Sequence, residues 1–77
     1  MKLRNLLKSV CVQGPVTIST WHDDAEIVLF DTDDFEDHRH EITNEVLNME
    51  IKYIFPRPAY SGNGAALAIE LKPKEED

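Results

Sequence analysis

The first ten residues repeat apolar side chains with the period of a helix. The apolar positions are Leu3, Leu6, Leu7 and Val10. This spacing puts them on one side of an α-helix, with basic and polar residues on the other side. The pair Gly14-Pro15 follows, where glycine can cap a helix and proline cannot continue it. We therefore predict an amphipathic helix that ends before residue 14.

Four later stretches are typical of β-strands: three alternate apolar and polar residues, and residues 26–31 are a short apolar run flanked by acids. They are residues 15–21, 26–31, 50–56 and 65–71. The polar residues 22–25 separate the first two stretches, which predicts a hairpin. The last two are joined by a loop that contains the turn signal Asn63-Gly64, so they are expected to form a second hairpin.

A second helix is indicated between the hairpins. Its apolar positions are Phe35, Ile42, Val46 and Met49. Residues 38–41 lack an apolar anchor, so this helix is expected to begin late, near Glu41. The element order is then α-β-β-α-β-β, which predicts an α+β fold: a four-stranded antiparallel sheet with two helices on one face. Residues 1–72 are expected to form one domain and residues 73–77 a charged tail.

The same periods separate a core from an exposed sheet face. The predicted core is Leu3, Leu6, Leu7, Val10, Val16, Ile18, Ile27, Leu29, Ile42, Val46, Ile51, Tyr53, Leu67 and Ile69. The other sheet face is expected to be wet and to carry Thr17, Ser19, Trp21, Lys52, Ala66, Ala68 and Glu70, with Ile54 and Phe55 on or near it. An apolar strip on so small a domain also favours association.

The composition narrows the class of protein. A chain of 77 residues with a formal charge of −7 is expected to avoid phosphate backbones and anionic membranes, because both are bound through Lys and Arg. The single cysteine, Cys11, forms no intramolecular disulfide, which fits a reducing compartment. No stretch approaches the ~20 apolar residues of a membrane helix, and the leucine-containing start is too short for a signal core. We expect a cytoplasmic protein.

Negative charge is concentrated in the middle of the chain. Residues 23–45 hold ten carboxylates and one arginine, a formal charge of −9. The candidate partner-binding carboxylates are Asp23, Asp24, Asp31, Asp33, Asp34, Glu36, Asp37 and Glu41, and the candidate apolar contacts are Trp21 and Tyr60. One interpretation is a solvated loop and helix face, with acids favoured near the helix N-terminus. The other is a surface that attracts a basic partner.

Metal and catalytic chemistry have little support in the sequence. A calcium loop that starts at Asp31 fails at Phe35, Glu36 and Ile42, where oxygen ligands and a glycine are needed. His38 and His40 would point about 200° apart on a helix. Cys11 is expected to be a buried small hydrophobe, and no serine lies in a nucleophile motif. We expect no enzyme, no metal and no organic cofactor, with a weak acidic metal-binding domain as an alternative.

Three segments carry a resemblance to a known group of proteins. They are the leading "MKLRNLLKSV", the central "EVLNMEIKYIFP" and the final "ALAIEL". With the first hairpin, they make the chain resemble short, acidic proteins without assigned function in Gram-positive bacteria and their prophages. The resemblance implies phage-borne accessory roles, including inhibition of host defence. The stretch "DTDDFEDHRH" is not expected as a general feature of such proteins.

Together these observations predict a small acidic module that binds rather than catalyses. The expected partner is a basic protein surface, with no direct contact to nucleic acid or membrane. The alternative is a nucleic-acid mimic that inhibits a DNA- or RNA-binding protein. A homodimer through the apolar sheet face or edge is predicted as well, with the acidic segments directed outward because like charges repel.

Overall fold

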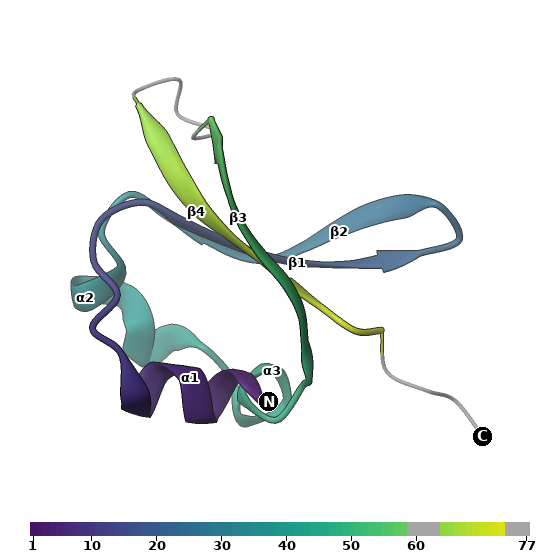
Figure 1. Ribbon diagram of the computed structural model, residues 1–77, viewed down its shortest axis with the longest axis horizontal. Helices are drawn as coiled ribbons and strands as arrows, with labels where there is room; N and C mark the ends of the chain where they lie inside the picture. Colours follow the sequence, from purple (N-terminus) through teal and green to yellow (C-terminus); the bar gives the residue numbers. More distant parts are fainter. Residues whose placement is uncertain (59–63, 74–77) are drawn as a thin grey trace.

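The computed structural model describes residues 1–58 and 64–73. The elements are α1 (Leu3–Ser9), β1 (Val16–His22), β2 (Ala25–Thr32), α2 (Phe35–His38), the 3-10 turn η1 (Arg39–Glu41), α3 (Asn44–Leu47), β3 (Ile51–Pro58) and β4 (Ala65–Leu71). Four strands form one sheet, and the helices lie together on one side of it (Figure 1). No helix among the described residues has the length and apolar character required to cross a membrane.

The α+β class is confirmed, but the predicted all-antiparallel sheet is wrong. The strand order is β2-β1-β4-β3, with antiparallel pairing inside each hairpin and parallel pairing between β1 and β4. Hairpin patterns determine only which consecutive strands pair. The junction between hairpins joins the two strands with the most buried residues, and it brings Ile18 beside Ile69 under the helices.

The second helix, predicted to begin near Glu41, is wrong: three short elements that begin at Phe35 replace it, namely α2, η1 and α3. Phe35 is fully buried at the start of α2, and its N–H donates to the carbonyl of Gly14 at 3.0 Å. Thr43 has an extended backbone, and its side chain accepts the N–H of Val46 at 3.3 Å, so it caps α3 as a separate helix. The helical spacing of the apolar residues continues across Thr43, so the pattern does not reveal that a new helix begins there.

The core lies between the sheet and the helices. Its fully buried large side chains include Leu3 of α1, Ile18 of β1, Phe35 of α2 and Ile69 of β4. Arg4 of α1 donates to the side chain of Asn48 at 3.4 Å, which holds α1 beside the end of α3. Several predicted core residues are partly buried against this cluster: Leu6, Leu29, Val46, Ile51 and Leu67.

Three predicted core residues are exposed, and three residues of the core cluster were missed. Val10, Ile27 and Tyr53 are exposed. The residues of the core cluster that the prediction lacks are Val12, Phe35 and Leu71. Val10 is the C-cap of α1 and has an extended backbone. Its side chain therefore does not continue the apolar side of the helix, as its spacing predicts.

A bulge explains the error in β3. The pairing with β4 shifts between Ile51 and Tyr53, with Lys52 as the extra residue. A shift of one residue sends every later side chain to the other face. Tyr53 therefore lies opposite Glu70 on the face without helices, whereas Ile54 lies opposite Ile69.

The predicted wet face is largely buried, although the helices of residues 1–58 all lie on the other side of the sheet (Figure 1). Thr17, Ser19, Ala66, Ala68 and Glu70 are all buried there. Longer side chains are hydrogen-bonded to one another on this face. Arg57 of β3 donates to Glu26 of β2 at 3.2 Å, and the ring N–H of Trp21 donates to Glu70 at 2.8 Å. We call this side of the sheet the open face.

Candidate interaction surface

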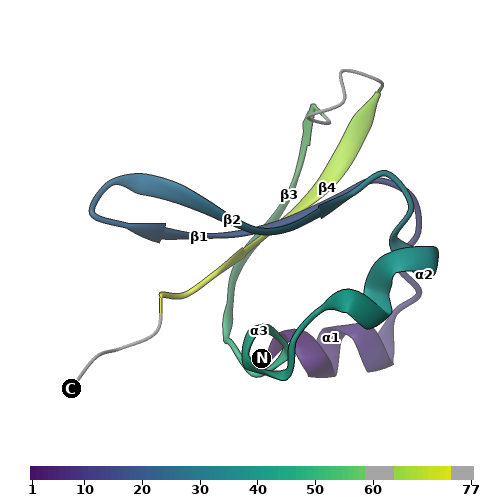
Figure 2. The ribbon, with the colours of Figure 1, turned by 180° about the vertical axis from the view of Figure 1, so that it is seen from behind.

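The first two acidic residues form the tip of the β1–β2 hairpin. Asp23 and Asp24 have φ angles of 50° and 65°, the left-handed conformation that a tight two-residue hairpin turn requires and that aspartate tolerates. The turn is therefore shorter than the predicted residues 22–25. The hairpin extends past the helices, and its turn lies at the far end (Figures 1 and 2). We name Asp23 and Asp24 the tip cluster.

The other six carboxylates lie between the end of β2 and η1. We name them the shoulder cluster: Asp31, Asp33, Asp34, Glu36, Asp37 and Glu41. Residues 25–30 of β2 separate Asp24 from Asp31, a distance of about 23 Å at ~3.3 Å per residue. The predicted acidic patch is therefore two patches, joined by β2.

Phe35 gives the shoulder cluster an ordered base. Its buried ring packs edge-to-face against Phe30, with centroids 6.1 Å apart, and the Arg39 guanidinium lies 5.8 Å from the ring centroid. The carboxylates around Phe35 are exposed. The acidic stretch is thus neither disordered nor a loose turn, because an apolar side chain anchors it in the core.

Hydrogen bonds orient part of the shoulder cluster. Asp31 accepts from the Thr17 hydroxyl at 2.7 Å, and Glu36 accepts from the Gln13 amide at 3.0 Å. The pKa of Asp37 is raised by its hydrogen bond with Asp34 and by the charge of that neighbour. Two carboxylates held so close repel each other when both are ionised.

An exposed pair lies at the far end of the shoulder cluster. His38 Nδ1 lies 2.7 Å from a carboxylate oxygen of Glu41. This hydrogen bond raises the pKa of His38 and lowers the pKa of Glu41. His38 is therefore engaged with a carboxylate rather than placed beside His40 for a shared metal ion.

The apolar candidates have different outcomes. Trp21 is 41% exposed on the open face near the tip, and Glu70, which accepts its ring N–H, lies 3.8 Å from the Lys52 ammonium. Tyr60 lies outside the described residues. Sequence reasoning missed Ile27 and Val28 of β2, which are 43% and 45% exposed. The sequence predicts Ile27 in the core. It is exposed because the hairpin extends beyond the helices there.

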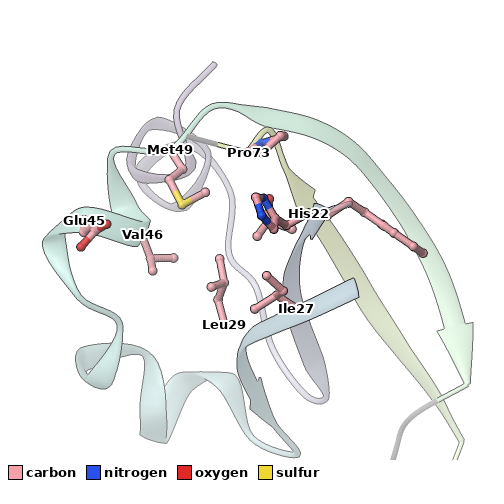
Figure 3. Close-up of a pocket in the computed structure, with 9 residues that line it drawn as sticks. His22, Ile27, Leu29, Glu45, Val46, Met49 and Pro73 are labelled. Atoms are coloured by element: carbon pink, nitrogen blue, oxygen red, sulfur yellow. The ribbon is translucent and has the colours of Figure 1, made fainter. Parts of the chain in front are cut away.

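A pocket opens between the hairpin and α3. Its volume is about 330 Å³, at the lower end of the range of small-molecule sites. Ile27 and Leu29 of β2 face Val46 and Met49 across it, with His22 and Pro73 on another side (Figure 3). The space remains because α3 has only four residues and does not reach over the end of the sheet.

The described residues offer no cluster for a metal ion. Across residues 1–58 and 64–73, no three His, Cys, Asp or Glu side chains are grouped to hold one. Cys11 is exposed, which contradicts its predicted burial, and its sulfur lies 3.8 Å from a carboxylate oxygen of Glu36. It stands in the irregular segment between α1 and β1, beyond the apolar stripe of the helix.

Comparisons with known proteins add no assignment. No family model matches the chain, and neither a curated protein nor a solved structure is significantly similar to it. The resemblance to short acidic phage proteins therefore stays a hypothesis, and the function must be argued from the surface.

Proposed function

We propose that this protein is a non-catalytic interaction module that binds a basic protein surface through its shoulder and tip clusters. The observation that carries the proposal is the ordered crowding of carboxylates at the shoulder, where Phe35 anchors an exposed acidic segment. A disordered acidic loop would spread its charges. A folded one holds them at constant positions, which favours recognition of a matching basic surface.

The electrostatics of the shoulder support a cationic partner. The raised pKa of Asp37 reflects its hydrogen bond with Asp34 and the repulsion between the two carboxylates, which the nearby His38 only partly offsets. A lysine or arginine placed beside the two carboxylates would favour their ionised forms. Binding would therefore release a proton where Asp37 is partly protonated, and salt would weaken it.

The alternative proposal, a nucleic-acid mimic, uses the same carboxylates. In that case the basic surface belongs to a DNA- or RNA-binding protein, and the protein competes with nucleic acid for it. Competition with a DNA or RNA oligonucleotide for the same partner separates this special case from a general basic partner.

A charge-matched pair of variants tests the proposal. The shoulder variant carries Asp33→Asn, Asp34→Asn and Asp37→Asn. The control carries Glu75→Gln, Glu76→Gln and Asp77→Asn, which removes the same charge near the C-terminus. The probe is a lysine-rich synthetic peptide, and titration calorimetry gives its affinity at low and high salt. We expect the shoulder variant to bind about tenfold more weakly than the control, about 1.4 kcal/mol.

Two results would contradict the proposal. Equal weakening in both variants would show that only the net charge matters. Binding that does not change with salt would remove the electrostatic role of residues 23–45.

A further inference from the structure

The two edges of the sheet are built differently. On β3, the N–H of Ile51 donates to the carbonyl of Met1 at 2.8 Å, and Pro56 and Pro58 have no N–H to offer. Prolines are tolerated on an edge strand and protect it from further pairing. The outer edge of β3 is therefore closed at both of its ends.

The outer edge of β2 lacks these devices. Among the residues that the structure describes, β2 has a neighbouring strand on one side only, and residues 25–32 contain no proline. Ile27 and Val28, both β-branched, are exposed in the middle of the strand. An edge of this kind presents backbone N–H and C=O groups that another strand can pair with.

The charges at the ends of β2 decide what kind of strand fits. The tip cluster precedes β2, and Asp31 and Asp33 of the shoulder cluster lie at its other end. A second copy paired antiparallel about the centre of Ala25–Thr32 would bring the tip cluster of each copy opposite the shoulder cluster of the other. A parallel copy would bring tip to tip. Like charges directly opposite are destabilising, so neither orientation of a second copy suits this edge.

We propose that the outer edge of β2 accepts an extended segment of the basic partner as a fifth strand. The segment has β-branched or apolar residues in its centre, beside Ile27 and Val28, and lysine or arginine at both ends, beside the two clusters. Main-chain hydrogen bonds would supply affinity and the terminal charges would supply selection. This inference rests on the proposed function and specifies how the partner is held.

The β-bulge in β2 limits where pairing starts. The register with β1 shifts between Ile18 and Ser19, which leaves Leu29 as the extra residue. A bulge locally disrupts a ladder and turns the strand. The regular half of the edge is therefore Ala25–Val28, next to the tip cluster, and the added strand is expected to pair there first.

Peptide probes test this mode on the full chain. The first probe is a synthetic peptide about as long as β2, with alternating valine and threonine in its centre and two lysines at each end. Two further probes carry backbone N-methyl groups at alternate residues. One probe is methylated along one edge of the extended peptide, and the other probe along the opposite edge. A fourth probe has glutamate in place of lysine. Binding is measured by calorimetry and by amide chemical shifts of β2.

Strand addition predicts an asymmetry that charge alone does not produce. The lysine peptide should bind and shift the amides of Ala25–Val28. Methylation along one peptide edge should weaken binding at least tenfold, because it removes donors to β2, and methylation along the other edge should have little effect. The glutamate peptide should not bind.

The failures are distinguishable. Equal binding of both methylated probes would overturn strand addition and leave the acidic interaction module intact. No binding of the lysine peptide even at low salt would overturn both.

A variant of the tip cluster sharpens the test without altering the fold. It carries Asp23→Asn and Asp24→Asn, because asparagine removes the charge and still accepts the positive φ of the turn. The control is Glu75→Gln with Glu76→Gln, which removes two charges near the C-terminus. We expect the tip variant to bind the lysine peptide about fivefold more weakly than the control. If the tip variant and the control bind the lysine peptide with equal affinity, the added strand does not reach from the shoulder cluster to the tip cluster.

Discussion

The two faces of the sheet are buried by different means. On the helix side, Ile18 and Ile69 lie under a separate layer that includes Phe35 and Leu3. On the open face, Thr17 and Ala68 are equally inaccessible, although the helices lie on the other side of the sheet (Figure 2). There most of the buried residues on the two central strands are small, and the Arg57–Glu26 ion pair joins the two flanking strands.

Because the two faces are buried differently, they are expected to contribute to the stability of this small domain in different ways. The helix side removes large apolar side chains from water, which contributes roughly 25 cal/mol per Å². The open face gains less apolar burial and must satisfy its polar groups. Among the described residues, no buried side-chain nitrogen or oxygen lacks a hydrogen-bond partner. Substitutions should therefore be costly on the helix side and should act through hydrogen bonds on the open face.

The largest expected effect is at Phe35. Phe35→Ala should lower the free energy of unfolding by about 3–5 kcal/mol, because it leaves a cavity under the shoulder cluster. Phe35→Leu keeps most of the volume and should cost clearly less. Urea denaturation of both variants measures the difference. A loss below about 1 kcal/mol for the alanine variant would show that the acidic segment is not anchored in the core.

The next largest effect is expected on α1. Leu7→Ala should cost about 2–5 kcal/mol, because Leu7 is buried against the sheet. Leu6 and Leu67 are only partly buried, so Leu6→Ala and Leu67→Ala should cost less. Thermal unfolding of the three variants ranks them. A larger loss for Leu6→Ala than for Leu7→Ala would mean that the helix presents another side to the core.

On the open face, Trp21→Phe tests the hydrogen-bonded cover. The change removes the donor to the buried Glu70 carboxylate and should cost about 1–3 kcal/mol, the typical penalty for an unsatisfied buried group. Tyr53→Phe, at a side chain that is 57% exposed on the same face, is the control and should be nearly neutral. If both variants lose the same free energy of unfolding, the hydrogen bond between Trp21 and Glu70 contributes nothing specific to stability.

A homodimer would change the comparison, because a second copy could cover the open face. Trp21, Tyr53 and Phe55 are exposed there, on strands other than β2, whose outer edge the basic strand is proposed to use. We predict a dimer whose dissociation does not change with salt, since apolar burial sets it. Sedimentation at several protein and salt concentrations measures it. A strict monomer at high concentration would contradict the dimer and would mean that no second copy covers the open face.

The smallest effect is expected from pH at the exposed His38–Glu41 pair. The raised pKa of His38 contributes stability below the ordinary histidine pKa, and this is lost as pH rises through the raised value. The lowered pKa of Glu41 contributes above the ordinary glutamate pKa, and this is lost as pH falls through the lowered value. The pair therefore acts at mildly acidic pH, between the two ordinary values.

Proton NMR can follow this pair directly. Glu41→Gln should bring the pKa of His38 down toward its ordinary value, because the hydrogen bond that raises it is lost. An unchanged His38 titration in this variant would show that another group causes the shift. The shoulder cluster would then need a different electrostatic account.

Much of the local structure could be predicted from the sequence. The strand at residues 65–71 was confirmed at both ends as Ala65–Leu71, and both hairpins formed as expected. The acidic residues of the candidate site were also found from the sequence, because charge is a property of composition. Phe35 was counted in a helical pattern, but its role as the anchor of the shoulder cluster was not foreseen.

Only the tertiary structure decided which hairpin strands became neighbours and which side chains were covered. One extra residue, Lys52, exchanges the faces of Tyr53 and Ile54, and alternation alone does not reveal where such a bulge will fall. The sequence by itself determined the first helix and the four strands, because periodicity acts over a few residues. The parallel junction of β1 with β4, the exposed edge of β2 and the separation of the acidic clusters depend on contacts between distant residues, which no local pattern records.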